Sequence, residues 1–405
     1  MPEAPWLTIV GLGEDGPDGL PPASRAALAQ AEVVAGPARH LALLPSLAAT
    51  CLEWPVPFVD GIPGLLALRG RKVVMLASGD PFWFGAGTTL ARHLRPGEWR
   101  ALPVPSTFSL AAAHLGWPLE TTQCLGLHAA PLARLRPHLA PGARALVLLR
   151  DGAAVAELAG YLAGEGFGAT RMHVLEALGG PRERTRAATA TEFHLATNFH
   201  PKEIAHPVAA GLEVAGDGPA LARCSGLPDD LFRNDGQITK RPVRALTLSA
   251  LAPRPGEMLW DIGAGSGSVG IEWLLAHPTT EAVAVEARAD RAARSRENAD
   301  ALGVDRLKVM EGVAPEALAG LPSPQAVFIG GGLCEHMLKA VWDLLPAGAR
   351  LVANAVTLES EALLTAWQAE AGGHLLRIAL ADTVPLGPRR GWQARYPVVQ
   401  WSVVR

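Results

Sequence analysis

A run of alternating glycines after an acidic residue is the segment best suited to chemistry, since residues 261–270 read DIGAGSGSVG. Apolar stretches precede and follow this run, so the sequence predicts a strand, a glycine loop and a helix. The glycines at issue are Gly263, Gly265 and Gly267. They remove side chains where a ligand must approach the backbone, and the helix start offers free N–H groups. The segment therefore predicts a nucleotide-type pocket.

Two kinds of cofactor are compatible with this loop. Gly265 to Gly270 satisfy the dinucleotide pattern, and Glu286 ends the next apolar run, where it can bind ribose hydroxyls. This favours an NAD-dependent oxidoreductase. Asp261, at the carboxyl end of the first strand, favours another ligand, because a dinucleotide fold needs no acid there and a carboxylate can bind an ammonium group directly or through water. With Asp261, the arrangement resembles the class I methyltransferases, which bind S-adenosylmethionine.

A second glycine loop follows an apolar run in the N-terminal half, at residues 76–85 (LASGDPFWFG). A simple turn explains Gly79 and its neighbouring proline, but VGLGEDG at 10–16 lies upstream and PVPSTFSLAAAHLGW at 103–117 lies downstream. This trio resembles the tetrapyrrole methylases of the corrin pathway, especially the branch acting on carbon 5, over residues 5–200. One departure is GLGEDG, where many relatives carry Gly-x-Gly-Pro-Gly.

That resemblance implies a site for S-adenosylmethionine in a cleft between two subdomains of the N-terminal half. The residues implied as its border are Gly79, Asp80, Ser106 and Thr107, with Phe84 packing nearby.

Three segments of the C-terminal half resemble the decarboxylating precorrin methyltransferases that act on carbon 15. They are GLPDDLFR at 226–233, QITKRPVR at 237–244 and NAVTLE at 354–359, and the likeness covers residues 220–405. Asn354, Thr357 and Glu359 follow a strand that should end at the same carboxyl edge, so we expect them to face the substrate as catalytic residues, together with Lys240. Thr357 followed by Glu359 is also typical of a helix N-cap, so both interpretations stay open.

Other residues of this half fit a cofactor site. The loop at 311–316 follows a strand where class I enzymes cover adenine, and Val313 stands where an acidic residue is frequent, so contacts from that side chain must be apolar. Residues 326–332 lack the Asn/Asp-Pro-Pro-Tyr of amino-group methylases, which disfavours methylation of a base nitrogen. The cofactor-binding set for this half is Thr239, Asp261, Gly263, Gly265, Gly267, Glu286, Gly312, Val313, Ala314 and Gly330.

The combination of both halves resembles the bifunctional precorrin C5,15-methyltransferases of cobalamin biosynthesis, which also decarboxylate. The chemistry this implies needs few acids and bases, because a meso carbon of a reduced tetrapyrrole is an enamine-like nucleophile and catalysis is mainly positioning. A non-catalytic S-adenosylmethionine sensor stays open as an alternative. The acetate and propionate groups of a tetrapyrrole require cations at the pocket mouth. The candidates are Lys240, Arg241, Arg244, Arg389 and Arg390, each of which also suits a solvated surface.

The elements that must position these residues alternate in α/β fashion. Apolar runs predict strands at 7–10, 72–77 and 144–149 in the first half and at 258–261, 282–286, 307–310, 326–329 and 350–354 in the second. Periodicity is lost over 197–218, which predicts domains 1–210 and 211–405. We expect an N-terminal tetrapyrrole methylase fold of two α/β subdomains with a cleft, and a C-terminal Rossmann-like class I methyltransferase fold.

Composition limits the partners. A chain of 405 residues with 49% hydrophobic and 19% charged residues suits two globular domains, and a net charge of −3 gives no footprint for nucleic acid. The four scattered cysteines suggest neither a metal site nor a disulfide framework. No run is long enough to span a membrane and no signal segment opens the chain, so we expect no membrane partner and a cytoplasmic location. The resemblance implies one S-adenosylmethionine site per domain and a homo-oligomer.

Overall fold

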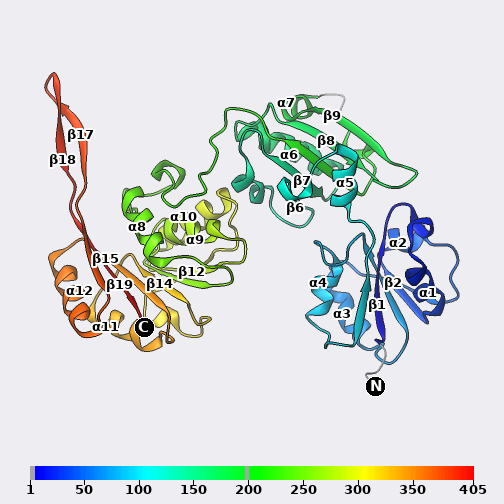
Figure 1. The fold of residues 1–405 in the computed structure, drawn as a ribbon, viewed down its shortest axis with the longest axis horizontal. Coiled ribbons are helices and arrows are strands. Elements are labelled where there is room, and N and C mark those ends of the chain that lie inside the picture. Colours follow the sequence, from blue (N-terminus) through cyan, green and yellow to red (C-terminus); the bar gives the residue numbers. More distant parts are fainter. Residues whose placement is uncertain (1–4, 197–199) are drawn as a thin grey trace. The chain divides into compact units, whose positions relative to one another are not determined.

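The computed structural model describes residues 5–196 and 200–405, which form two compact α/β units (Figure 1). Unit 1 extends to Ala130 and resumes from His138 to Pro219, and unit 2 holds Pro131–Pro137 and Ala220–Arg405. Unit 1 therefore continues past residue 210, where the sequence places the end of the first domain. Residues 197–199, at the start of the expected boundary segment, lie outside the described residues.

The first sheet of unit 1 is parallel, in the order β3-β2-β4-β1-β5. Its strands are β1 (Leu7–Leu12), β2 (Val33–Gly36), β3 (Thr50–Glu53), β4 (Val73–Ser78) and β5 (Trp99–Leu102). Alternate β1 residues face opposite sides: Ile9 packs with helices α3 (Ile62–Leu66) and α4 (Ala86–Ala91), and Val10 with α1 (Pro22–Gln30) and α2 (Ala38–Leu43). Burial of both faces explains the continuous apolar runs.

The second sheet of unit 1 is mixed, in the order β6-β7-β10-β8-β9. Its strands are β6 (Gln123–Gly126), β7 (Arg144–Leu149), β8 (Arg171–Glu176), β9 (Arg184–Thr189) and β10 (Val208–Glu213). The accompanying helices are α5 (Thr107–Leu115), α6 (Gly152–Gly164) and α7 (Ala190–Leu195). β10 is the central strand, antiparallel to both β7 and β8, so a boundary after residue 210 would cut the core of this sheet.

Unit 2 contains one seven-stranded sheet, in the order β13-β12-β11-β14-β15-β19-β16. Five strands are parallel: β11 (Met258–Ile262), β12 (Glu281–Glu286), β13 (Lys308–Glu311), β14 (Ala326–Ile329) and β15 (Arg350–Ala355). These match the five strands expected from the sequence. The helices are α8 (Arg241–Leu251), α9 (Ser268–Ala276), α10 (Ala289–Ala301), α11 (Glu335–Leu344) and α12 (Leu358–Ala371).

Both faces of the unit 2 sheet are covered. Trp260 packs on one side with residues of α11 and α12, whereas Leu259 packs on the other with residues of α8, α9 and α10. This two-sided burial leaves the edge at the strand ends as the place where polar residues can meet a ligand.

The last part of the sheet reverses direction, which the sequence did not lead us to expect. β19 (Val398–Val404) pairs antiparallel with β15 on one side and with β16 (His374–Ile378) on the other. Between β16 and β19 the chain forms the hairpin of β17 (Ala381–Leu386) and β18 (Arg389–Ala394), which projects from the sheet in Figure 1. Among the described residues, no helix is both long and apolar enough to cross a membrane.

Candidate active site

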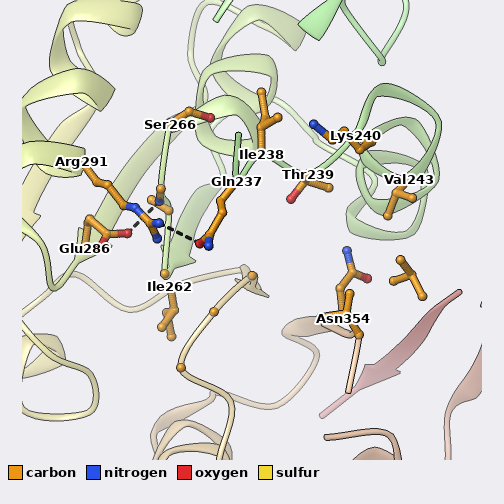
Figure 2. A pocket seen from close by; sticks show the side chains of 18 of the residues that line it. Gln237, Ile238, Thr239, Lys240, Val243, Ile262, Ser266, Glu286, Arg291 and Asn354 are labelled. Atoms are coloured by element: carbon orange, nitrogen blue, oxygen red, sulfur yellow. Dashed lines mark hydrogen bonds between the residues drawn. The ribbon is translucent and has the colours of Figure 1, made fainter. Parts of the chain in front are cut away.

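A cavity of about 1000 Å³ opens in unit 2 beside the carboxyl ends of the parallel strands (Figure 2). Its walls come from the segment before α8, the loops after β11, β12, β13 and β14, the end of β15, and the base of the β17–β18 hairpin. Sites of this size hold cofactor-sized ligands, and this sheet edge is where open α/β sheets bind them. The lining includes ten of the residues singled out from the sequence: Thr239, Lys240, Gly263, Gly265, Glu286, Gly312, Val313, Ala314, Gly330 and Asn354.

Two glycines of the loop after β11 play different parts. Gly263 has φ +67°, and a Cβ there would lie 2.6 Å from the backbone nitrogen of Gly331, so the loop after β14 leaves no room for a side chain. Gly265 has φ +58°, and the nearest atom to its Cβ position would be the carbonyl oxygen of Gln237 at 3.8 Å. Gly263 thus permits close packing of two loops, whereas Gly265 keeps the cavity itself open. Gly267 caps α9 and lies outside the cavity lining.

The Asp261 carboxyl lies behind the glycine loop, at 1% exposure, and is not part of the lining. Its Oδ2 accepts a hydrogen bond from the Gly270 N–H at 2.9 Å, whereas Oδ1 has no partner among the described residues. Burial, and to a smaller degree the Glu286 charge, raises the pKa of Asp261 to about 7, against the effect of the Gly270 bond. In this geometry Asp261 holds the loop to the start of α9 and does not reach the cavity.

Glu286 ends β12 with both carboxylate oxygens committed to the backbone. Oε2 accepts from the Gly265 N–H at 2.8 Å and Oε1 from the Arg288 N–H at 3.0 Å. Arg291 lies beside it in Figure 2 and donates to Gln237 Oε1 at 2.7 Å and to the Asp235 carboxylate at 2.8 Å. These bonds tie the segment before α8 to α10 across one end of the cavity.

The four residues expected to be catalytic divide into two pairs. Lys240 and Asn354 line the cavity, whereas Thr357 and Glu359 do not. Thr357 is the N-cap of α12 and its hydroxyl accepts from the Ser360 N–H at 3.2 Å. Glu359 is exposed in the first turn of the same helix. The helix-cap interpretation is therefore the one the structure realises.

Most of the cations expected to bind substrate carboxylates lie outside the cavity lining. Arg244 is fully buried and paired with Glu272 at 2.6 Å and Asp229 at 2.9 Å, so it anchors α8 and is not available to a substrate. Arg241, Arg389 and Arg390 are exposed and outside the cavity lining. Lys240 keeps the expected position. Arg395, at the base of the hairpin, is a lining cation that the sequence interpretation missed.

The expected residues of unit 1 also come together. A Cβ on Gly79 (φ +52°) would lie 2.9 Å from the Cα of Ser106, so the loop after β4 is pressed against the start of α5. Ser106 caps that helix, accepting from the Ser109 N–H at 3.1 Å, and Asp80 accepts from the Phe82 N–H at 2.8 Å.

Phe84 completes this cluster at φ +57°, half exposed, with its ring centroid 5.8 Å from that of Phe108. Gly79 and Thr107 line a cavity of only about 30 Å³ with residues of both subdomains. That space is far below the several hundred Å³ of a typical cofactor site.

Comparison with known proteins agrees with this two-part organisation. The family model described as tetrapyrrole (corrin/porphyrin) methylases matches residues 6–194, and that of the precorrin methyltransferase domain matches residues 230–405. A precorrin-6Y C(5,15)-methyltransferase [decarboxylating] of Sinorhizobium sp. is 50% identical over 98% of this chain and 96% of its own length. The chain belongs to the decarboxylating precorrin C5,15-methyltransferases.

Two further proteins of this family are similar to the chain. The protein of the same name from Mycobacterium tuberculosis (strain H37Rv) is 40% identical over 98% of this chain and all of its own length. A solved C-terminal domain of precorrin-6Y C5,15-methyltransferase from Rhodobacter capsulatus is 53% identical, with a TM-score of 0.44, and covers 46% of this chain and 100% of that one.

As a member of the precorrin C5,15-methyltransferases, the chain is an S-adenosylmethionine-dependent enzyme with decarboxylating activity. The residues of unit 2 fit that cofactor, because the cavity is large enough, Gly265 leaves it open, and Val313 and Ala314 supply an apolar wall. The space that Gly79 and Thr107 line in unit 1, at about 30 Å³, is smaller than this cofactor. The family assignment excludes the interpretation of the glycine loop as a nicotinamide-binding site.

Several lining residues of this precorrin methyltransferase escaped the sequence interpretation. Arg291 was missed because it meets Gln237, of the segment 237–244, only after folding brings α10 beside the segment before α8. Arg395 and Tyr396 reach the cavity because the chain returns through β19. The apolar run at 398–404 was a signal for that returning strand.

Proposed function

We propose that this enzyme methylates precorrin-6Y at carbon 5 in unit 1 and at carbon 15 in unit 2, where it also removes the carboxyl group of the ring C acetate. The observation that carries the proposal is the unit 2 cavity, which brings Lys240 and Asn354 together with the glycine loop. The names of the relatives support the same two positions and the decarboxylation.

One S-adenosylmethionine site in each unit is part of this proposal. When bound, S-adenosylmethionine supplies an activated methyl group on a positively charged sulfur. In unit 2 the backbone around Gly265, the Glu286 carboxylate and the loop at 312–314 would hold it. In unit 1 the motif cluster of Gly79, Asp80 and Thr107 supports the assignment by resemblance.

The side chains of unit 2 suit positioning catalysis. A meso carbon of the reduced macrocycle is already nucleophilic, so the protein must hold the reacting atoms in line and keep water out. Val313 and Val356 supply apolar wall, and Lys240 supplies a cation for a substrate carboxylate.

Decarboxylation then needs an electron acceptor. Methylation at carbon 15 converts the neighbouring enamine into an iminium group. The bond between the acetate methylene and its carboxyl carbon breaks, the electron pair moves toward that iminium, and carbon dioxide leaves. The role of the protein is to orient and desolvate the carboxylate, so no general base is required at this step.

The decisive experiment is mass spectrometry of the pigment formed from the full chain, precorrin-6Y and S-adenosylmethionine labelled in its methyl group. The proposal expects two labelled methyl groups and the loss of one carbon dioxide. Cofactor binding with no change in pigment mass would contradict precorrin-6Y as the substrate. A homo-oligomer and a cytoplasmic location are further parts of the proposal, tested by light scattering on the purified protein and by cell fractionation.

A further inference from the structure

A buried polar cluster lies directly behind Asn354. Thr247 on α8 is fully buried and Gln400 on β19 is 3% exposed, whereas Asn354 on β15 is half-buried and lines the cavity. Gln400 is the cross-strand partner of Asn354 in the β15–β19 pair. Buried polar side chains cost free energy unless they are hydrogen-bonded, so a Thr and a Gln at such positions call for a physical reason.

The hydrogen bonds of this cluster fix the orientation of both amides. The Thr247 hydroxyl donates to the Val243 carbonyl at 2.9 Å, so its oxygen must accept from its other neighbours. Asn354 Nδ2 and Gln400 Nε2 each donate to that oxygen at 3.0 Å. Gln400 Nε2 uses its second hydrogen toward Asn354 Oδ1, also at 3.0 Å. A flipped Asn354 would place its carbonyl oxygen against an oxygen that has no hydrogen left to give.

The bonded cluster leaves Asn354 with a limited set of free groups. An asparagine amide has two N–H donors and two acceptor lone pairs. One N–H is used by Thr247 and one lone pair by Gln400. One N–H and one lone pair therefore remain for a ligand. Figure 2 shows Asn354 on the part of the cavity wall that faces Thr239, Lys240 and Val243.

We propose that Thr247 and Gln400 are positioning residues, which lock the Asn354 amide so that its remaining N–H binds the carboxylate that leaves as carbon dioxide. This inference rests on the proposed function of unit 2. A neutral N–H suits the task, because it orients the carboxylate without the strong charge stabilisation that an adjacent cation gives to the ground state. The electron pair of the breaking bond can then flow toward the iminium.

The test compares Thr247→Val with Thr247→Ser in the full chain. Valine has nearly the same shape but no hydroxyl, so both amides lose their shared acceptor, whereas serine keeps it. We expect Thr247→Val to slow release of carbon dioxide by on the order of 100-fold and to accumulate a doubly methylated pigment that keeps its carboxyl group. Thr247→Ser should restore decarboxylation, and affinity for S-adenosylhomocysteine should stay unchanged in both.

Two further variants separate positioning from stability. Thr365→Val removes an equivalent hydroxyl, which donates to the carbonyl of Glu361 at 2.8 Å on the exposed face of α12, and should leave decarboxylation unchanged. Gln400→Met provides a second route if Thr247→Val does not fold, with the same retained carboxyl group expected. Adding Thr247→Val to Asn354→Ala should cause little further loss, because the two residues act as one unit.

The outcomes distinguish this inference from the proposed function. If the wild-type chain releases no carbon dioxide from precorrin-6Y, the proposed function fails. If the wild type releases it and Thr247→Val and Gln400→Met do so at the same rate, the positioning role is wrong. Equal loss of methylation at carbon 15, of decarboxylation and of cofactor binding would likewise overturn it, since a purely structural residue acts in that way.

Discussion

At the scale of single residues, burial decides what the charged groups around the cavity do. Asp261 lies behind the glycine loop with one oxygen bonded to the Gly270 N–H, and the other has no partner within residues 5–196 and 200–405. Removal from water disfavours its ionised form, and the pKa rises from 3.8 to about 7. The protonation of this carboxyl, which lies behind the glycine loop, therefore changes with the pH of the solution.

That pKa predicts a pH-dependent stability. Between pH 3.8 and about 7 the folded chain keeps a proton on Asp261 that the unfolded chain has lost. The stability linked to this proton is present at low pH and is lost as the pH rises through 7. The Asn side chain of Asp261→Asn cannot ionise. The melting temperature of the variant, relative to that of the wild type, should therefore rise from pH 5 to pH 8. Parallel melting curves over this range would contradict the assignment.

Two neighbouring glycines provide a second prediction. Gly263→Ala places a methyl group against the backbone of Gly331 and should lower stability by several kcal/mol, roughly 3. Gly265→Ala meets no protein atom closer than 3.8 Å, so its stability cost should be limited to about 1 kcal/mol for the left-handed backbone. The added methyl group at position 265 narrows the cavity instead. Calorimetric titration should show at least ~10-fold weaker S-adenosylhomocysteine binding for the Gly265→Ala variant; unchanged affinity would place the cofactor elsewhere.

At the scale of elements, helix α8 connects the segment that carries Thr239 and Lys240 to the sheet. It begins directly after Lys240, and its first turn is anchored by the buried Arg244 guanidinium through Glu272 on α9 and Asp229. Farther along, Thr247 joins it to β15 and β19. The position of this helix therefore sets where Thr239 and Lys240 enter the cavity.

Removing that anchor should be costly. Arg244→Ala leaves the Glu272 carboxylate buried without its cation, and such losses cost about 3–5 kcal/mol. Arg241→Ala, three residues earlier on the exposed side of the same helix, is the matched control and should change stability by less than ~0.5 kcal/mol. Urea unfolding of both variants measures the difference. A similar small effect for both would show that Arg244 is not an anchor.

The elements differ in how far the sequence could foretell them. Strands such as β11 and β14 are buried on both faces, so their apolar runs identified them and placed the glycine loop correctly. The hairpin of β17 and β18 is mostly exposed, and no long apolar run marked it. Arg244 was taken as a substrate cation because its burial depends on Glu272, a residue 28 positions away that only the packing of two helices brings close.

At the scale of the whole molecule, two units carry two sets of site residues on one chain. The motif cluster around Gly79 lies wholly in unit 1, and the large cavity lies wholly in unit 2. Each set is built by its own sheets, and no strand in the described part of the chain is shared between the units. The two methylations should therefore be separable by single substitutions.

Asp80→Ala tests this separation. Its carboxylate caps a turn at the Phe82 N–H in unit 1, so the variant should lose methylation at carbon 5 while unit 2 continues to act. The expected pigment is decarboxylated and carries one labelled methyl group. Asp261→Ala is the reciprocal variant and should lose carbon 15 methylation and decarboxylation together. Loss of both methyl groups in Asp80→Ala would show that the sites depend on each other.

The position of β19 within the sheet has a consequence for the synthesis of the protein on the ribosome. This strand is synthesised after every other strand of the unit 2 sheet, yet it lies between β15 and β16. Until residues 398–404 emerge, both neighbours present unpaired edges, which are prone to pair with other chains. The nascent chain also lacks Val398, which lines the cavity, and Gln400, which holds Asn354 from behind. The cavity of unit 2 is therefore completed only after the last strand of its sheet has been synthesised.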